Sequence, residues 1–113
     1  MDKTEPQYTS KVKRKLGDLQ LLITQMSESM GRIEDSKESR NQAIRYLGEV
    51  VATFNKAFKF GFVSIQDSTE FSDRLYWLTS PLSTTSDVLK VGYFAEKLLE
   101  KELNRIVEHD QIN

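Results

Sequence analysis

The chain has 113 residues with nearly balanced charge, 16 Lys and Arg against 17 Asp and Glu, and it contains no cysteine. Its length is that of one domain, and the balanced charge argues against a disordered polyelectrolyte or a general nucleic-acid-coating protein. The lack of cysteine excludes disulfides, thiolate nucleophiles and thiolate metal sites.

No apolar stretch approaches the ~18–20 residues that a membrane-spanning helix needs. The N-terminal methionine is followed by polar residues and Pro6, not by the apolar segment of a secretory signal. We therefore expect a cytoplasmic protein with one domain over 1–113 and a flexible N-terminal tail over 1–9.

Apolar residues after this tail recur at alternating intervals of four and three, which is the spacing of one face of a helix. A polar segment, 34–42, divides the pattern into two runs with the same phase. The first run is Val12, Leu16, Leu19, Ile23, Met26, Met30 and Ile33, and the second is Ile44, Leu47, Val51, Phe54 and Phe58.

Two structures explain the shared phase. One helix over 10–60 would be roughly 75 Å long and would need a partner or an oligomer. Alternatively, the chain turns back near 31–36, where Gly31 ends the first helix and Asp35 with Glu38 forms the capping box of the second. We favour the hairpin, because charged residues, Lys37 and Arg40, occupy the intervening positions of the apolar face.

The second helix also carries small and apolar residues, Ala43, Val50 and Ala57, beside its main apolar face. Such residues widen the apolar stripe, as in a helix that touches two neighbours in a bundle. The complementary flanking charges of a two-stranded coiled coil are missing from the first helix. A helical bundle therefore fits better than an isolated coiled coil.

A short helix is expected next, opened by a second Asp-x-x-Glu pattern at Asp67 and closed by Pro81. Before it, the aromatic residues of 58–65 alternate with period two, so a short strand is the alternative for this segment.

The last helix follows loop and cap residues at 83–87. We expect it to bury Val88, Val91, Ala95, Leu98, Leu99, Leu103 and Ile106. The whole chain is thus predicted to be an all-α bundle of about four helices, the first two forming a long heptad-patterned hairpin, with its oligomeric state left open.

The residues offer little for catalysis. His109 is the only histidine, and no second histidine or any cysteine exists to form a metal site with it. The five glycines do not form a phosphate-binding loop. We therefore expect no catalytic residue, metal, cofactor or small-molecule substrate, and a protein that is not an enzyme.

One pair of residues near the C-terminus points to a different function. Arg105 and His109, with three residues between them, resemble the Arg-x(4–6)-His motif of the HEPN ribonucleases, which are small, all-helical and dimeric. The resemblance covers these two residues only and is one residue short of the motif. It implies RNA cleavage that depends on His109.

Aromatic residues are concentrated in one part of the chain, where seven of the eleven lie within 54–77. They cannot all share one helix face, so part of this cluster is expected to be exposed, as at protein interfaces. We predict that Phe60, Phe62 and Trp77 anchor a protein–protein interface. The expected function is a non-enzymatic interaction module, such as a regulator, inhibitor or immunity factor, chaperone or complex subunit, that binds a protein partner or itself.

A second candidate surface is the basic cluster over 11–15. Its four cations lie at the start of a helix, where positive charge is unfavourable. They could bind phosphates, so the alternative function is a nucleic-acid-binding accessory protein. The cluster consists of Lys11, Lys13, Arg14 and Lys15.

Overall fold

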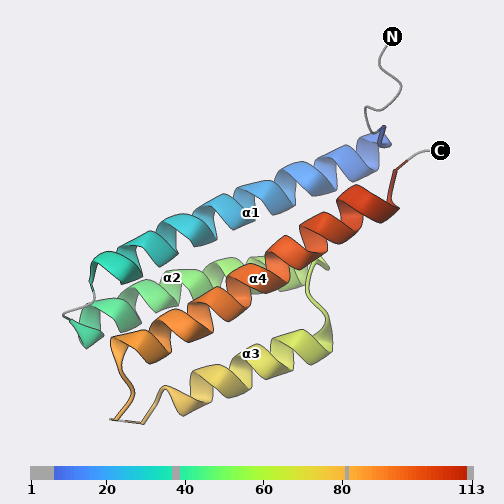
Figure 1. Cartoon of the computed structure of the whole chain (residues 1–113). Helices are drawn as coiled ribbons and strands as arrows, with labels where there is room; N and C mark the ends of the chain where they lie inside the picture. Colours follow the sequence, from blue (N-terminus) through green and yellow to red (C-terminus); the bar gives the residue numbers. More distant parts are fainter. Residues whose placement is uncertain (1–6, 37–38, 81, 112–113) are drawn as a thin grey trace.

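The computed structural model describes residues 7–36, 39–80 and 82–111, and within them it has four helices and no strand (Figure 1). The predicted all-α helical bundle is therefore confirmed. The short strand considered for 58–65 is wrong, because this segment holds the end of one helix, a turn and the start of the next. The helices are α1 (Ser10–Asp35), α2 (Arg40–Lys59), α3 (Ile65–Trp77) and α4 (Thr85–His109).

Three long helices, α1, α2 and α4, build the core, and the short α3 lies on the outside against α4 (Figure 1). α1 packs along both α2 and α4, so the first helix of the chain pairs with the last. Residues at the centre of the three long helices have no exposed surface, among them Leu19, Met26, Val50 and Leu99.

The apolar face of α2 is rotated from the predicted one. Ala43, Val50 and Ala57, which were expected only to widen the stripe, are fully buried, whereas Ile44 and Phe58 are partly exposed. The reason is that α2 contacts α1 and α4 at the same time. Small side chains let both neighbours approach closely.

The hairpin between α1 and α2 is confirmed, but its predicted end signals are wrong. α1 continues past Gly31 to Asp35, and the residue that caps α2 is Ser39, not Asp35. The Ser39 hydroxyl accepts a hydrogen bond from the backbone N–H of Gln42 at 3.3 Å. A serine immediately before the first helical residue is closer to the free N–H groups than the earlier aspartate. Residues 37 and 38, which the hairpin argument also used, lie outside the described residues.

The turn after α2 depends on Gly61, whose φ of +82° is in the left-handed region that favours glycine. α3 then begins after Ser64, whose hydroxyl accepts from the N–H of Asp67 at 3.0 Å. The predicted cap at Asp67 is therefore wrong, since Asp67 already lies in the first turn.

The expected cap of the last helix is present. Thr84 and Asp87 form a capping box at the start of α4. The Asp87 carboxylate accepts from the Thr84 backbone N–H at 2.8 Å, and this bond lowers the pKa of Asp87 below its usual value. The predicted helix end at Pro81 falls on a residue outside the described ones, and α3 itself ends at Trp77.

The molecule is elongated and thin, 57 × 28 × 17 Å along its principal axes. The start of α1 and the end of α4 lie together at one tip (Figure 1). There the Tyr8 hydroxyl donates to the Val107 carbonyl at 2.8 Å, and Thr9 caps α1. Of the predicted tail, residues 1–6 lie outside the described ones.

Candidate partner-binding site

The three predicted interface residues occupy different environments. Phe60 is 57% exposed at the end of α2 and Trp77 is 74% exposed at the end of α3, but Phe62 is only 7% exposed. The turn at Gly61 directs the chain inward after Phe60, and the two phenylalanine rings meet edge to face with centroids 6.1 Å apart. The expected exposure is confirmed for Phe60 and Trp77, and it is wrong for Phe62, which belongs to the core.

The two exposed aromatic residues are also far apart. Phe60 precedes α3, whereas Trp77 is its last residue. A helix of 13 residues is about 20 Å long, so the two rings lie at opposite ends of α3. They cannot contribute to one compact patch, and each must be considered with its own neighbours.

A pocket of about 420 Å³ lies beside Trp77, between the end of α3 and the start of α4. Its floor contains the buried side chains of Leu78 and Val91. Trp77 and Leu82 line it from the exposed side, and Leu82 is 86% exposed. The other lining residues are polar or charged: Arg74, Ser80, Ser83, Asp87 and Lys90.

The charges around this pocket differ in how firmly they are held. Arg74 donates to Glu70 at 3.1 Å, and its guanidinium lies 4.1 Å from the centre of the Phe94 ring. The Asp87 carboxylate is occupied by the cap of α4. Lys90 is exposed and forms no ion pair within the described ranges.

Arg40 fixes the loop that forms one wall of the pocket. It lies at the start of α2, and its Nε donates to the Ser83 carbonyl at 2.8 Å. Its Nη2 donates to the Ser83 hydroxyl at 2.8 Å and to the Ser80 carbonyl at 3.2 Å. Sequence reasoning identified Arg40 only as an interruption of the apolar face. Its partners are about 40 positions away in the chain, so no local pattern could reveal them.

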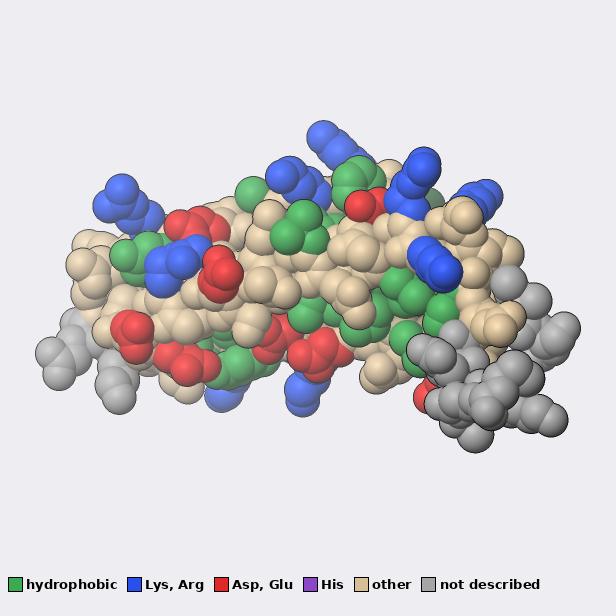
Figure 2. Space-filling view, turned by 90° about the horizontal axis from the view of Figure 1, so that it is seen from above, with side chains coloured by type: hydrophobic (Ala, Val, Ile, Leu, Met, Phe, Trp, Pro, Cys, Tyr) green, Lys and Arg blue, Asp and Glu red, His purple; other side chains and the backbone are tan. Residues whose placement is uncertain are grey.

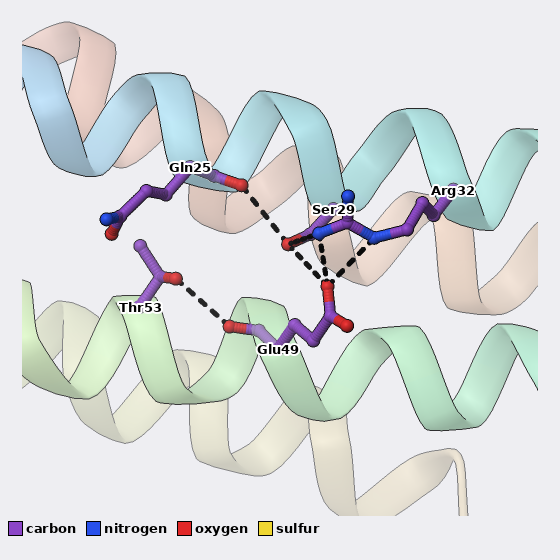
Figure 3. A network of polar contacts seen from close by, with 5 residues as sticks. All are labelled: Gln25, Ser29, Arg32, Glu49 and Thr53. Carbon is purple, nitrogen blue, oxygen red and sulfur yellow. Dashed lines mark hydrogen bonds and ion pairs between the residues drawn. The ribbon is translucent and has the colours of Figure 1, made fainter.

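Another polar group joins α1 to α2 (Figure 3). Ser29 Oγ and Arg32 Nε both donate to Oε1 of Glu49, at 3.1 and 3.0 Å. The Arg32 hydrogen bond is the main reason that the pKa of Glu49 lies below its usual value. This network joins the two helices, and Arg32 bonds to both the Glu49 carboxylate and the Ser29 hydroxyl.

The residues of the HEPN-like pair lie on the exposed end of α4. Arg105 donates to both carboxylate oxygens of Glu102, at 2.8 and 2.9 Å. His109 is exposed, and its Nε2 lies 4.0 Å from Oε2 of Glu108. The described residues contain no group of three potential metal ligands. Ribonuclease activity stays a prediction that rests on the two residues alone.

The four residues of the basic cluster are all exposed on the first turns of α1. No acidic residue accompanies them in the first turn of this helix.

Comparison with family models, curated proteins and solved structures finds no match for the chain. Among the helices of the described ranges, none has the length and apolar character to span a membrane.

Proposed function

We propose that the chain is a small non-enzymatic module that binds another protein through the pocket between α3 and α4. The observation that carries this proposal is the exposed apolar surface at a concave site. Trp77 and Leu82 line the pocket and are 74% and 86% exposed, and Tyr76, whose ring packs against Trp77, is 69% exposed. Large apolar side chains that remain exposed together are typical of interaction sites. Tryptophan and arginine are also the residues that most often dominate binding energy at interfaces.

The chemistry of the pocket suggests what the partner presents. An apolar side chain of the partner would contact the floor at Leu78 and Val91 and would be covered by the Trp77 ring. Arg74 is paired with Glu70, whereas Lys90 forms no ion pair with the described residues, so Lys90 is the cation best placed to meet a carboxylate. The expected partner segment therefore has an apolar residue flanked by Asp or Glu.

The experiment uses Trp77 as the reporter, because it is the only tryptophan in the chain. Peptides selected from a random display library on the intact protein are added to the unlabelled protein, and tryptophan emission is recorded. Binding in the pocket should move the Trp77 emission to shorter wavelength. Leu82→Ser and Lys90→Glu should each lower the affinity for the peptide at least fivefold.

The matched control is Ile65→Ser, which changes another strongly exposed apolar residue, at the start of α3 and away from the pocket. This variant should bind the peptides as the unchanged protein does. The proposal would be contradicted by peptides that bind without shifting the Trp77 emission. It would also be contradicted by peptides whose affinity is unchanged by Leu82→Ser and Lys90→Glu. Light scattering separates self-association from binding of another protein, since a dimer that Leu82→Ser dissociates would make the partner a second copy.

A further inference from the structure

We propose that the edge formed by the start of α1 and the end of α2 binds single-stranded nucleic acid. This inference does not depend on the pocket at the end of α3, because it concerns other helices. Its starting point is the exposed basic cluster over 11–15. Positive charges at a helix N-terminus oppose the helix dipole, so the cluster does not serve the stability of α1.

Two of these cations lie on the side of α1 that faces α2. Steps of seven residues return to nearly the same side of an α-helix. Two such steps lead from Ser29 to Lys15, and three lead from Arg32 to Lys11. Ser29 and Arg32 both donate to Glu49 of α2 (Figure 3). Lys11 and Lys15 therefore continue the side of α1 that carries these contacts.

The end of α2 adds further cations to the same edge. In two antiparallel helices, a step backward along one matches an equal step forward along the other. One seven-residue step from the Ser29–Glu49 contact brings α2 to Lys56, nearer to the basic start of α1. Lys59 and Phe60 follow within one turn, and all three side chains are exposed.

The edge is strongly positive although the whole chain has a net charge of −1. One acidic residue of α1, Asp18, lies between the basic cluster over 11–15 and the part of α1 that is opposite Lys56. Figure 2 shows Lys and Arg side chains following one another along one long edge, toward the end where α1 begins. Within the described part of the chain, no ion pair involves Lys56, Lys59 or any cation of the basic cluster over 11–15.

Phe60 distinguishes the expected ligand from a general polyanion. Its ring is 57% exposed and adjoins Lys59. An exposed ring among cations is the arrangement in which single-stranded nucleic acid is bound, because the cations contact phosphates while a base stacks on the ring. A duplex would offer phosphates but no free base to this ring.

The direct test measures fluorescence polarisation of a fluorescein-labelled 15-nucleotide oligothymidine with the full chain. Binding is expected at 50 mM salt. Four or five phosphate contacts to a single strand predict a slope of about −3 in log affinity against log salt, so affinity should fall about 60-fold between 50 and 200 mM. No binding at 50 mM would overturn the proposal.

Charge reversal locates the site. Lys56→Glu combined with Lys59→Glu should weaken binding at least tenfold. The control, Lys97→Glu with Lys101→Glu, makes the same change of net charge on exposed positions of α4 and should alter affinity less than threefold. An equal loss in both variants would mean that only net charge matters, and would overturn the proposal.

Phe60 supplies the second discriminating measurement. Phe60→Ala should lower the affinity for the oligonucleotide at least fivefold, whereas Phe60→Trp should retain it. Unchanged affinity in Phe60→Ala would refute the stacking contact. Equal binding of a duplex, of polyglutamate or of anionic vesicles would assign the edge to another polyanion and would likewise overturn the proposal. Far-UV circular dichroism verifies that each variant remains helical.

Discussion

The three long helices and α3 are held in the molecule in different ways. α1, α2 and α4 each bury six residues, whereas α3 buries only Phe71. The Phe71 ring packs against Phe54 of α2, with centroids 4.1 Å apart. A helix of 13 residues is marginal in water without tertiary contacts, so α3 depends on this one ring and a few partly buried neighbours.

This difference explains where an exposed pocket can form. The three long helices bury most of their apolar residues against one another, whereas α3 leaves Tyr76 and Trp77 at its end 69% and 74% exposed. Binding surfaces often lie on the less stable elements of a protein. The following variants test whether α3 is an independent attachment or an integral part of the core.

The largest effect is expected within the bundle. Leu99→Ala removes a fully buried side chain at the centre of α4 and should lower the free energy of unfolding by about 2–5 kcal/mol. Urea denaturation followed by circular dichroism measures this loss. The exposed Leu82→Ala should stay within about 0.5 kcal/mol of the unchanged protein. A small effect of Leu99→Ala would mean that the three-helix core is not the stable unit.

The next effect concerns the attachment of α3. Phe71→Ala should cost less than the ~3–5 kcal/mol of a phenylalanine truncation in a core, because α3 can detach while the bundle stays folded. Hydrogen exchange should then show loss of protection in α3 only. Equal loss of protection in α1, α2 and α4 would show that α3 is part of one cooperative core.

Arg40 links the bundle to the loop after α3. Arg40→Gln removes the charged hydrogen bonds to Ser80 and Ser83 and should destabilise by about 1–3 kcal/mol. Amides of 78–84 should exchange faster than in the unchanged protein. Arg45→Gln, on an exposed position of the same helix, is the control. Unaltered exchange in 78–84 would mean that the loop is held by other contacts.

The smallest effect is electrostatic and belongs to α4. Burial, followed by the charges of Glu100 and Glu34, raises the pKa of Glu96 above its usual 4.5. A raised folded-state pKa means that stability is lost as pH rises through that value, so Glu96→Gln should stabilise at pH 7 by about 0.5 kcal/mol or less.

This gain should vanish at pH 3.5, where the Glu96 side chain is protonated in both states. Thermal melts of the variant at the two pH values measure it. Glu108→Gln, on an exposed position of the same helix, is the control. A variant that is less stable than the unchanged protein at pH 7 would contradict the sign of this effect.

The sequence was most informative about the helices and least informative about their ends. Periodic apolar spacing predicted the long helical runs, because one buried face dictates that period. The hairpin was favoured over a single long helix by the charged residues that interrupt the apolar face. The ends were harder, since Ser39 and Ser64 compete with nearby Asp-x-x-Glu patterns and lie closer to the first helical residues. The sequence could not show that Phe60 is exposed and Phe62 buried, because the turn at Gly61 decides which ring points inward.

The candidate surfaces depended on contacts between distant segments. Trp77 was identified from the aromatic cluster, but Leu82 and Lys90 complete its pocket only after α4 folds back on α3. The basic residues of α1 were found, whereas Lys56 and Lys59 required the antiparallel register of α1 and α2. Such pairings carry no local signal, because they arise from tertiary packing.

The hydrogen bond between Tyr8 and Val107 holds the two ends of the folded chain side by side. A short peptide linker would therefore join them, and the resulting circle could be reopened at the exposed Gly61 without cutting a helix. In that permuted protein α3 would come first in the chain and α2 last, and every helix would still pack against the same helices. The new ends would lie next to Phe60, so a label could be attached there, beside the basic edge.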